Sequence, residues 1–335
     1  MLIDGGIGFH ADNIAEQARS VEEDGYDGAW TAETGHDPLL TLALAAGATE
    51  RLALGTGITV AFGRSPMITA TMANDVQLIS RGRLLLGLGS QIKPHIERRY
   101  SMPWSHPAAR MREYIRALHA IWDCWNEGSK LDFRGEFYHH SLMTPFFNPG
   151  PNPYGKPKVL LAAVGELMSE VAGEVADGIL IHGFTTERYL RQVTMPAVGR
   201  GIKKGGRDRT SFQVSYPGFV VTGETEEQIA QAAGAVKAQI AFYGSTPAYR
   251  GVLELHGWGD LQSELHPLSK RGEWAEMAKL VDDEVLNTFA VVAPPDQVAP
   301  EVLRRYGDVV DRFSFYAPYQ LPPSGWAAVL AGFRV

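Results

Sequence analysis

Residues 52–66 read LALGTGITVAFGRSP, and this stretch decides how the rest of the chain is interpreted. An apolar run of this kind is typical of a buried strand, yet it contains Gly55 and Gly57. Glycine weakens a strand, because it costs backbone entropy on folding and packs no side chain. The two glycines therefore indicate either a tight turn or the close approach of some other group to the backbone.

The same stretch lies within a regular alternation of short apolar runs and longer helical patterns. Upstream, residues 28–32 are predicted as a strand and 38–48 as a helix; downstream, Pro66 opens a predicted helix to about residue 79, since proline suits the first helical turn. The whole chain contains eight predicted strands, at 2–4, 28–32, 52–59, 83–89, 158–163, 178–182, 212–222 and 312–316. Repeated βα units predict an α/β fold, the (β/α)8 TIM barrel, with a doubly wound sheet as the alternative.

Two parts of the chain interrupt this alternation, after the fourth and after the seventh predicted strand. Residues 90–107 form a charged connection, and a helix with apolar residues at 3.6-residue spacing follows it. Residues 128–156 contain a predicted hairpin, LDFRGEFYHH, and a segment rich in Pro, Gly and Asn, while residues 244–285 have irregular helical patterns. We expect one domain, 1–335, whose insertions shape a substrate pocket and a homodimer interface.

The composition argues against several classes of protein. The 38 acidic and 31 basic residues give a net charge of -7 and are mixed along the chain, which does not favour binding to nucleic acid or to an anionic membrane. The one cysteine, Cys124, excludes an internal disulfide framework, and the ten histidines form neither H-x-H nor H-E-x-x-H, so no metal is expected. With no signal-peptide pattern and no apolar run long enough to span a membrane, the sequence predicts a cytoplasmic protein.

Polar residues follow the second predicted strand, in the stretch AWTAETGHDP. In a barrel the loops after the strands build the active site, so Glu33, His36 and Asp37 are candidate catalytic residues. A carboxylate and an imidazole this close could relay a proton or polarise a carbonyl group. Asp37 has a second interpretation, as the N-cap of the helix that begins at Pro38.

The ends of later strands carry candidate phosphate sites. Gly89, Ser90 and Gln91 follow the fourth strand, and Gly165 opens a helix whose N-terminal N–H groups suit a phosphate. His182 ends the sixth strand, either as a ligand or as a residue hydrogen-bonded in the core. The run GGIGFHA has the G-x-G-x-x-A spacing of a dinucleotide site, but the strand before it is very short.

Six segments, taken in order along the chain, resemble the bacterial luciferase-like monooxygenase superfamily: VEEDGYDGAWTAE, LALGTGITVAFGRSP, SRGRLLLGLGSQ, ARMREYIRALHAIW, DFRGEFYHH and VADGILIH. Within it, the chain most resembles the oxidoreductases that use the deazaflavin coenzyme F420. The resemblance covers residues 25 to about 319. It implies hydride transfer between F420 and a small organic substrate. The alternatives are an FMN-dependent monooxygenase that uses reduced flavin and oxygen, and a non-enzymatic cofactor-binding protein.

The resemblance also implies site residues. It implies a non-prolyl cis peptide bond between Gly57 and Ile58, in a bulge beside Thr56 that contacts one face of the tricyclic ring. Glu33 corresponds to an acidic position near the ring, but Thr34 stands where the glucose-6-phosphate dehydrogenases of the family have histidine, so a sugar phosphate is not expected as substrate. The implied phosphate and ribityl contacts are Gly89, Ser90, Gln91, Ala163, Val164, Gly165 and Glu166.

Overall fold

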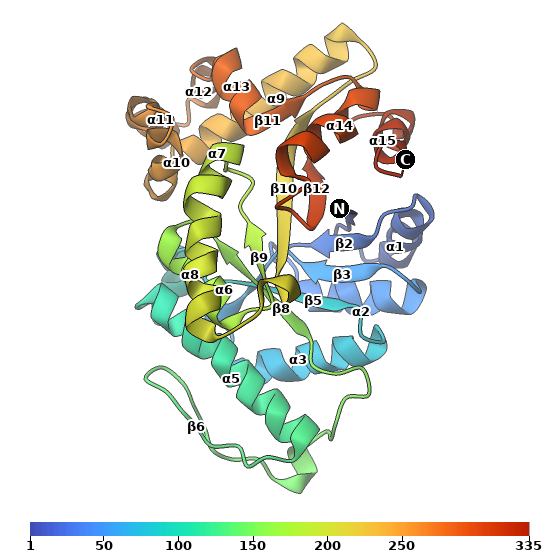
Figure 1. The fold of residues 1–335 in the computed structure, drawn as a ribbon, viewed down its shortest axis with the longest axis vertical. Coiled ribbons are helices and arrows are strands. Elements are labelled where there is room, and N and C mark those ends of the chain that lie inside the picture. Colours follow the sequence, from blue (N-terminus) through green and yellow to red (C-terminus); the bar gives the residue numbers. More distant parts are fainter. Residues whose placement is uncertain (335) are drawn as a thin grey trace.

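Eight parallel strands close into a barrel in the structure, a computed structural model that describes residues 1–334 (Figure 1). Around the barrel the order is β1, β2, β3, β5, β8, β9, β10 and β12, and β12 pairs with β1 to close the ring. The strands are β1 (Leu2–Gly6), β2 (Gly28–Thr31), β3 (Ala53–Thr56), β5 (Leu84–Gly89), β8 (Lys158–Ala163), β9 (Gly178–Ile181), β10 (Gln213–Val221) and β12 (Arg312–Tyr316). All eight predicted strands form, which confirms the (β/α)8 barrel and rules out the doubly wound sheet.

Helices surround the strands, and several begin at residues that satisfy free N–H groups. The carboxylate of Asp37 accepts a hydrogen bond from the backbone N–H of Leu39, and Ser65 caps the next helix in the same way. The π-helical turn Leu190–Thr194 lies directly between the helices Glu187–Tyr189 and Met195–Gly205. The outer helices are α1 (Ile14–Glu23), α2 (Pro38–Ala48), α3 (Pro66–Ile79), α6 (Glu166–Val175), α7 (Glu187–Tyr189), α8 (Met195–Gly205), α14 (Pro295–Tyr306) and α15 (Pro323–Ala331).

The first insertion follows β5 and contains mainly helix. It comprises α4 (Lys93–Arg98), α5 (Pro107–Glu127) and the small hairpin of β6 (Phe133–Arg134) and β7 (His139–His140). The hairpin was predicted, whereas α4 falls within residues 90–107, which were predicted as a charged connection without a helix. In Figure 1 the hairpin extends beyond α5, at the end of the molecule away from the second insertion.

The second insertion follows β10 and contains α9 (Glu226–Gly244), α10 (Arg250–Glu254), α11 (Gly259–Arg271), α12 (Trp274–Lys279) and α13 (Asp283–Phe289). It ends in β11 (Ala290–Val292), a strand that was not predicted. Phe219 of β10 is in register with Ala290 of β11 and with Tyr316 of β12. These two partners lie on opposite edges of β10, so β11 pairs with β10 on the β9 edge, beyond the point where β9 ends.

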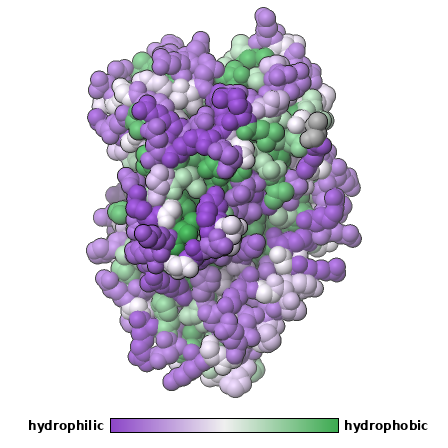
Figure 2. All heavy atoms as spheres, viewed as in Figure 1, coloured by the Kyte–Doolittle hydropathy of each residue, from purple (hydrophilic) through white to green (hydrophobic). Residues whose placement is uncertain are grey.

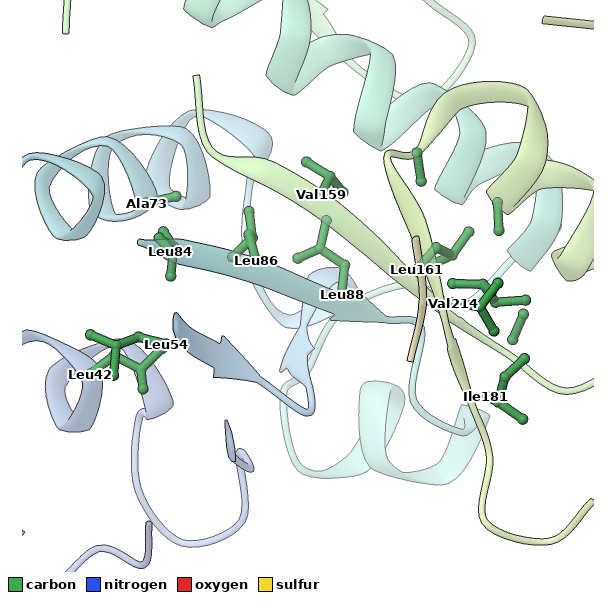
Figure 3. Packing of buried hydrophobic residues seen from close by; sticks show 14 of the residues in the cluster. Leu42, Leu54, Ala73, Leu84, Leu86, Leu88, Val159, Leu161, Ile181 and Val214 are labelled. Atoms are coloured by element: carbon green, nitrogen blue, oxygen red, sulfur yellow. The ribbon is translucent and has the colours of Figure 1, made fainter. Parts of the chain in front are cut away.

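Buried side chains alternate between the inside and the outside of the barrel. Leu84, Leu86 and Leu88 of β5 belong to the large core between strands and helices, which Figure 3 shows with Leu42 and Ala73 of the helices. The inner cluster has Leu85, Leu160 and Leu180 at its centre, packed against Trp30, Ala53, Ile58 and Ala162. This period of two is the pleat of a β-strand, and it explains why the strands appear as continuous apolar runs.

The outer surface on the side of Figure 1 is mostly hydrophilic, with apolar side chains grouped near the middle of that face (Figure 2). No helix within residues 1–334 has both the length and the apolar character needed to cross a membrane.

Candidate functional site

A bulge separates β3 from the short strand β4 (Thr59–Val60), and the peptide bond between Gly57 and Ile58 within it is cis, as the resemblance implied. Backbone hydrogen bonds tie the bulge to the end of β2. The N–H of Gly57 donates to the carbonyl of Thr31 at 2.8 Å, and the N–H of Glu33 donates to the carbonyl of Ile58 at 3.1 Å. Gly57 is exposed and Ile58 is half-buried, so the bulge presents a small, apolar surface at the carboxyl ends of the strands.

The two glycines of this stretch have different reasons for lacking a side chain. A Cβ atom at Gly55 would lie 2.3 Å from Cε3 of Trp30, so the indole ring itself makes the close approach to the strand. The indole N–H of Trp30 donates to Asp4 at 2.7 Å, and Asp4 also forms a buried ion pair with Arg312. At Gly57 the nearest atom to a Cβ would be Trp30 Cε3, at 3.7 Å. The protein therefore leaves Gly57 accessible, with Trp30 held beside it.

Glu33 lies at the centre of a partly buried polar network behind the bulge. Its carboxylate accepts hydrogen bonds from the N–H of Val60 at 2.8 Å, the guanidinium of Arg64 at 2.6 Å and the hydroxyl of Tyr100 at 2.6 Å. Arg64 also pairs with Asp37 at 2.7 Å. Burial and the hydrogen bond to Glu33 raise the pKa of Tyr100 to about 12, so this hydroxyl is a donor at neutral pH. The network joins β2, β4 and the start of α2.

His36 lies apart from this network. Its exposed ring stacks on Phe9, with the ring centroids 3.7 Å apart. Arg64 therefore joins Glu33 to Asp37. Glu33 and His36, which were predicted to act as a neighbouring carboxylate and imidazole, have different partners. The prediction of Asp37 as a helix cap is confirmed by its hydrogen bond to Leu39.

The predicted cofactor residues gather on three neighbouring strands. A Cβ at Gly89 would lie 2.2 Å from Cδ1 of Ile58, so the end of β5 packs directly against the bulge. Ser90 and Gln91 follow, with Gln91 in the left-handed region at φ 60°. Because β5 and β8 are paired, the loop containing Ser90 lies beside the half-buried Val164 and the exposed Gly165, which is the N-cap of α6. A Cβ at Gly165 would meet no atom within 4 Å.

Three predicted residues direct their side chains elsewhere. Thr56 is buried and its hydroxyl donates to the carbonyl of Gly87 at 2.7 Å; Ala163 packs in the outer core; Glu166 is exposed and pairs with Arg200 at 2.7 Å. Thr56 and Ala163 therefore offer only their backbone groups to a ligand. On β8 the inner residue is Ala162, which the period-two alternation from Leu160 indicates.

A second polar group lies at the ends of β9 and β12, and the sequence reasoning identified only its histidine. His182 contacts Tyr243 and Tyr249, with ring centroids 4.7 Å away in each case, and the hydroxyls of Tyr243 and Tyr316 are 2.6 Å apart. Tyr316 is the last residue of β12, so the rule of searching strand ends finds it. The two other tyrosines come from the end of α9 and the loop after it, which no strand-end rule includes.

Two surface hollows lie away from these strand ends. One of about 510 Å³ is lined by the first insertion, between Cys124 and Asn148, and one of about 370 Å³ lies beside Arg191, His256 and Arg305. Three of the arginines in the second hollow pair with Glu187, Glu301 or Asp308, so much of their charge is compensated. Within residues 1–334, no three His, Cys, Asp or Glu side chains are grouped as a metal site would require.

The chain belongs to the luciferase-like monooxygenase family, since the model of that family matches residues 3–312. An uncharacterized protein of Mycobacterium tuberculosis is 56% identical over 312 residues, which cover 93% of this chain and 92% of the relative. A 5,10-methylenetetrahydromethanopterin reductase of Archaeoglobus fulgidus is 28% identical over 84% of this chain and 82% of its own length. Among solved structures, the coenzyme F420-dependent tetrahydromethanopterin reductase of Methanopyrus kandleri superposes with a TM-score of 0.79 at 22% identity, covering 100% of this chain and 99% of that one.

Proposed function

We propose that this member of the luciferase-like monooxygenase family is an oxidoreductase that transfers hydride between coenzyme F420 and a small organic substrate. The observation that carries the proposal is the open bulge: Gly57 is exposed, and Trp30 and Ile58 beside it are half-buried and apolar. Relatives whose names include F420 or a methanopterin reductase support the choice of cofactor. The alternative remains an FMN-dependent monooxygenase, since this scaffold also suits a flavin.

The residues present fit a flat tricyclic ring with a phosphorylated tail. A ring placed on Gly57 meets backbone and the apolar surface of Ile58 rather than a protruding side chain. The N-terminus of α6 offers free N–H groups and the positive end of a ten-residue helix, with no side chain at Gly165 to obstruct a phosphate. When bound, the deazaflavin supplies the hydride chemistry. The protein orients the ring, excludes water from the site and provides protons.

The polar residues at β2 have separate tasks in this proposal. Glu33 and Asp37, joined through Arg64, hold the bulge in place for the ring. His36 lies on the exposed side of the same loop and is assigned to proton exchange at the mouth of the barrel. Ser90, Gln91 and Val164 border the phosphate. A homodimer, built with the insertions, is also part of the proposal and is tested by size-exclusion chromatography with light scattering.

Titration of the purified protein with F420 and with FMN tests the proposal directly. Each cofactor is followed by its own fluorescence, and the protein is held at fixed concentration. We expect saturable micromolar or tighter binding of F420. Binding of FMN with no response to F420 would exchange the proposal for its alternative, and binding of neither would reject both.

A further inference from the structure

The second polar group, which we call the tyrosine–histidine wall, consists of His182, Tyr243, Tyr249 and Tyr316. It lies across the barrel mouth from the bulge, because β9, β10 and β12 are three or four strands away from β3 in a closed ring of eight. Leu180 of β9 points into the barrel and reaches β5: its Cδ1 lies 2.6 Å from where a Cβ at Gly87 would be. His182 is two residues further on, hence on the same inner face and one step nearer the mouth.

Hydrogen bonds determine where His182 carries its proton. The backbone N–H of Phe184 donates to Nδ1 at 3.0 Å, so Nδ1 is an acceptor and a neutral imidazole carries its proton on Nε2. That Nε2 lies 3.4 Å from the hydroxyl of Tyr249. Burial lowers the pKa of His182 to about 4, which keeps the ring neutral at physiological pH.

The wall offers hydrogen-bond donors and apolar area but carries no charge. Burial also raises the pKa of Tyr249 and of Tyr316, so both hydroxyls stay protonated. Tyr316 packs closely against the chain after β9, where a Cβ at Gly183 would lie 2.8 Å from its ring. All four residues of the wall are only partly buried, so each keeps some surface open.

From this arrangement we infer that the wall is the substrate-binding face of the site and that it selects an uncharged carbonyl compound or alcohol. The inference rests on the proposed function, since it places the substrate between the wall and the ring. A neutral imidazole N–H can polarise a carbonyl group as a hydrogen-bond donor. A carboxylate or phosphate would find no cation among these four residues, and a buried charge without a partner is strongly disfavoured. The tyrosine rings supply the apolar contact.

The reaction balances with these groups. In the reduction of a ketone, a C–H bond of the reduced deazaflavin would break and its electron pair would form the new C–H bond at the carbonyl carbon, while the π pair of the C=O bond moves to oxygen. The ketone is thereby reduced and the deazaflavin oxidised. Nε2–H of His182 and the hydroxyl of Tyr249 stabilise the negative charge that develops there. A proton from solvent then converts the oxygen to the alcohol, and the oxidation follows the same steps in reverse.

The selection is tested with two ketones that differ in one group. Phenylacetone and phenylpyruvate share the benzyl ketone, and the methyl group of the first is replaced by a carboxylate in the second. Binding to the F420-loaded protein is measured by calorimetry, after cofactor binding has been measured alone. We expect phenylacetone to bind at least tenfold more tightly. Equal or tighter binding of phenylpyruvate, or binding of neither ketone, overturns the inference. If F420 still binds in that case, the proposed function is not affected. Loss of F420 binding itself rejects the proposed function.

Variants separate the hydrogen bonds from packing. His182→Gln keeps an N–H donor and His182→Leu removes it. Tyr249→Phe removes one hydroxyl of the wall. The control is Tyr154→Phe, which removes a hydroxyl on the surface away from the wall. We expect single-turnover hydride transfer to phenylacetone to fall about a hundredfold in His182→Leu and to recover to within about tenfold of wild type in His182→Gln, with F420 affinity unchanged. Equal rates in His182→Leu and wild type at matched melting temperature overturn the assignment, as does a loss in which His182→Gln gives no rescue.

Discussion

Replacing Gly165 by aspartate tests the proposed phosphate site without disturbing the fold. Gly165 has extended backbone, φ -93° and ψ 166°, and a Cβ there meets no atom within 4 Å. Aspartate is a preferred N-cap residue, and an acidic group at a helix N-terminus is stabilising by about 0.3–1 kcal/mol. The variant should therefore fold, with a melting temperature equal to or slightly above that of wild type.

The expected loss of affinity follows from Coulomb's law. A carboxylate about 5 Å from one negative charge of a phosphate costs about 0.8 kcal/mol in water and about 3.3 kcal/mol at an effective dielectric constant of 20. Gly165 is exposed, so the true value lies between these limits. Since about 1.4 kcal/mol is a factor of ten, F420 should bind about 4- to 250-fold more weakly. The aspartate side chain also competes for the N–H groups of α6.

The assay is fluorescence titration of F420 into Gly165→Asp, Gly165→Ala and Gly234→Asp. Alanine adds the Cβ without the charge, and Gly234 on α9 likewise has open space around its Cβ, so its aspartate adds the same charge away from the site. We expect weaker binding only in Gly165→Asp, and a smaller deficit at high salt because the site is exposed. Unchanged affinity in Gly165→Asp, or an equal loss in Gly234→Asp, would refute the placement of the phosphate.

Three further predictions concern the bulge, the network behind it and the wall. Gly55→Ala should lower the free energy of unfolding by about 1–3 kcal/mol, because its Cβ overlaps Trp30. Gly57→Ala should leave stability nearly unchanged and weaken cofactor binding. Urea denaturation and the F420 titration distinguish the two variants, and equal destabilisation of both would contradict the prediction. Glu33→Gln should cost about 2–4 kcal/mol, since it leaves Arg64 with only Asp37 as a charged partner, and calorimetry showing an unshifted melting temperature would disprove it. The pKa of His182 is about 6.5 in the unfolded chain and about 4 in the folded protein, so wild type should lose stability as the pH falls from about 6.5 to 4. Urea denaturation at several pH values should show a smaller loss of stability in His182→Gln. Identical pH profiles of the two proteins would contradict the prediction.

Local patterns were sufficient for the barrel and for one detail of the site, and the resemblance to a family supplied a second detail. The eight strands were predictable because each is a short apolar run bounded by turns, a signal contained within a few residues, and the helix cap at Asp37 depends only on Asp37 and the next two residues. The bulge at Gly57 was implied by the resemblance of the segment 52–66 to a family. The strand β11 was missed because three residues carry too little pattern to separate them from the helix before.

The contacts that give the site its chemistry depend on segments far apart in the chain. Trp30, not a ligand, occupies the space left by Gly55, which follows from the pairing of β2 with β3. Arg64 joins Glu33 to Asp37 from 27 or more residues away, and Tyr249 reaches His182 only because the second insertion folds back over the barrel. Strand periodicity tells which face of its own element a side chain occupies. Which groups meet there is decided when the barrel closes, because closure brings together residues whose separation along the sequence carries no information about their distance in space.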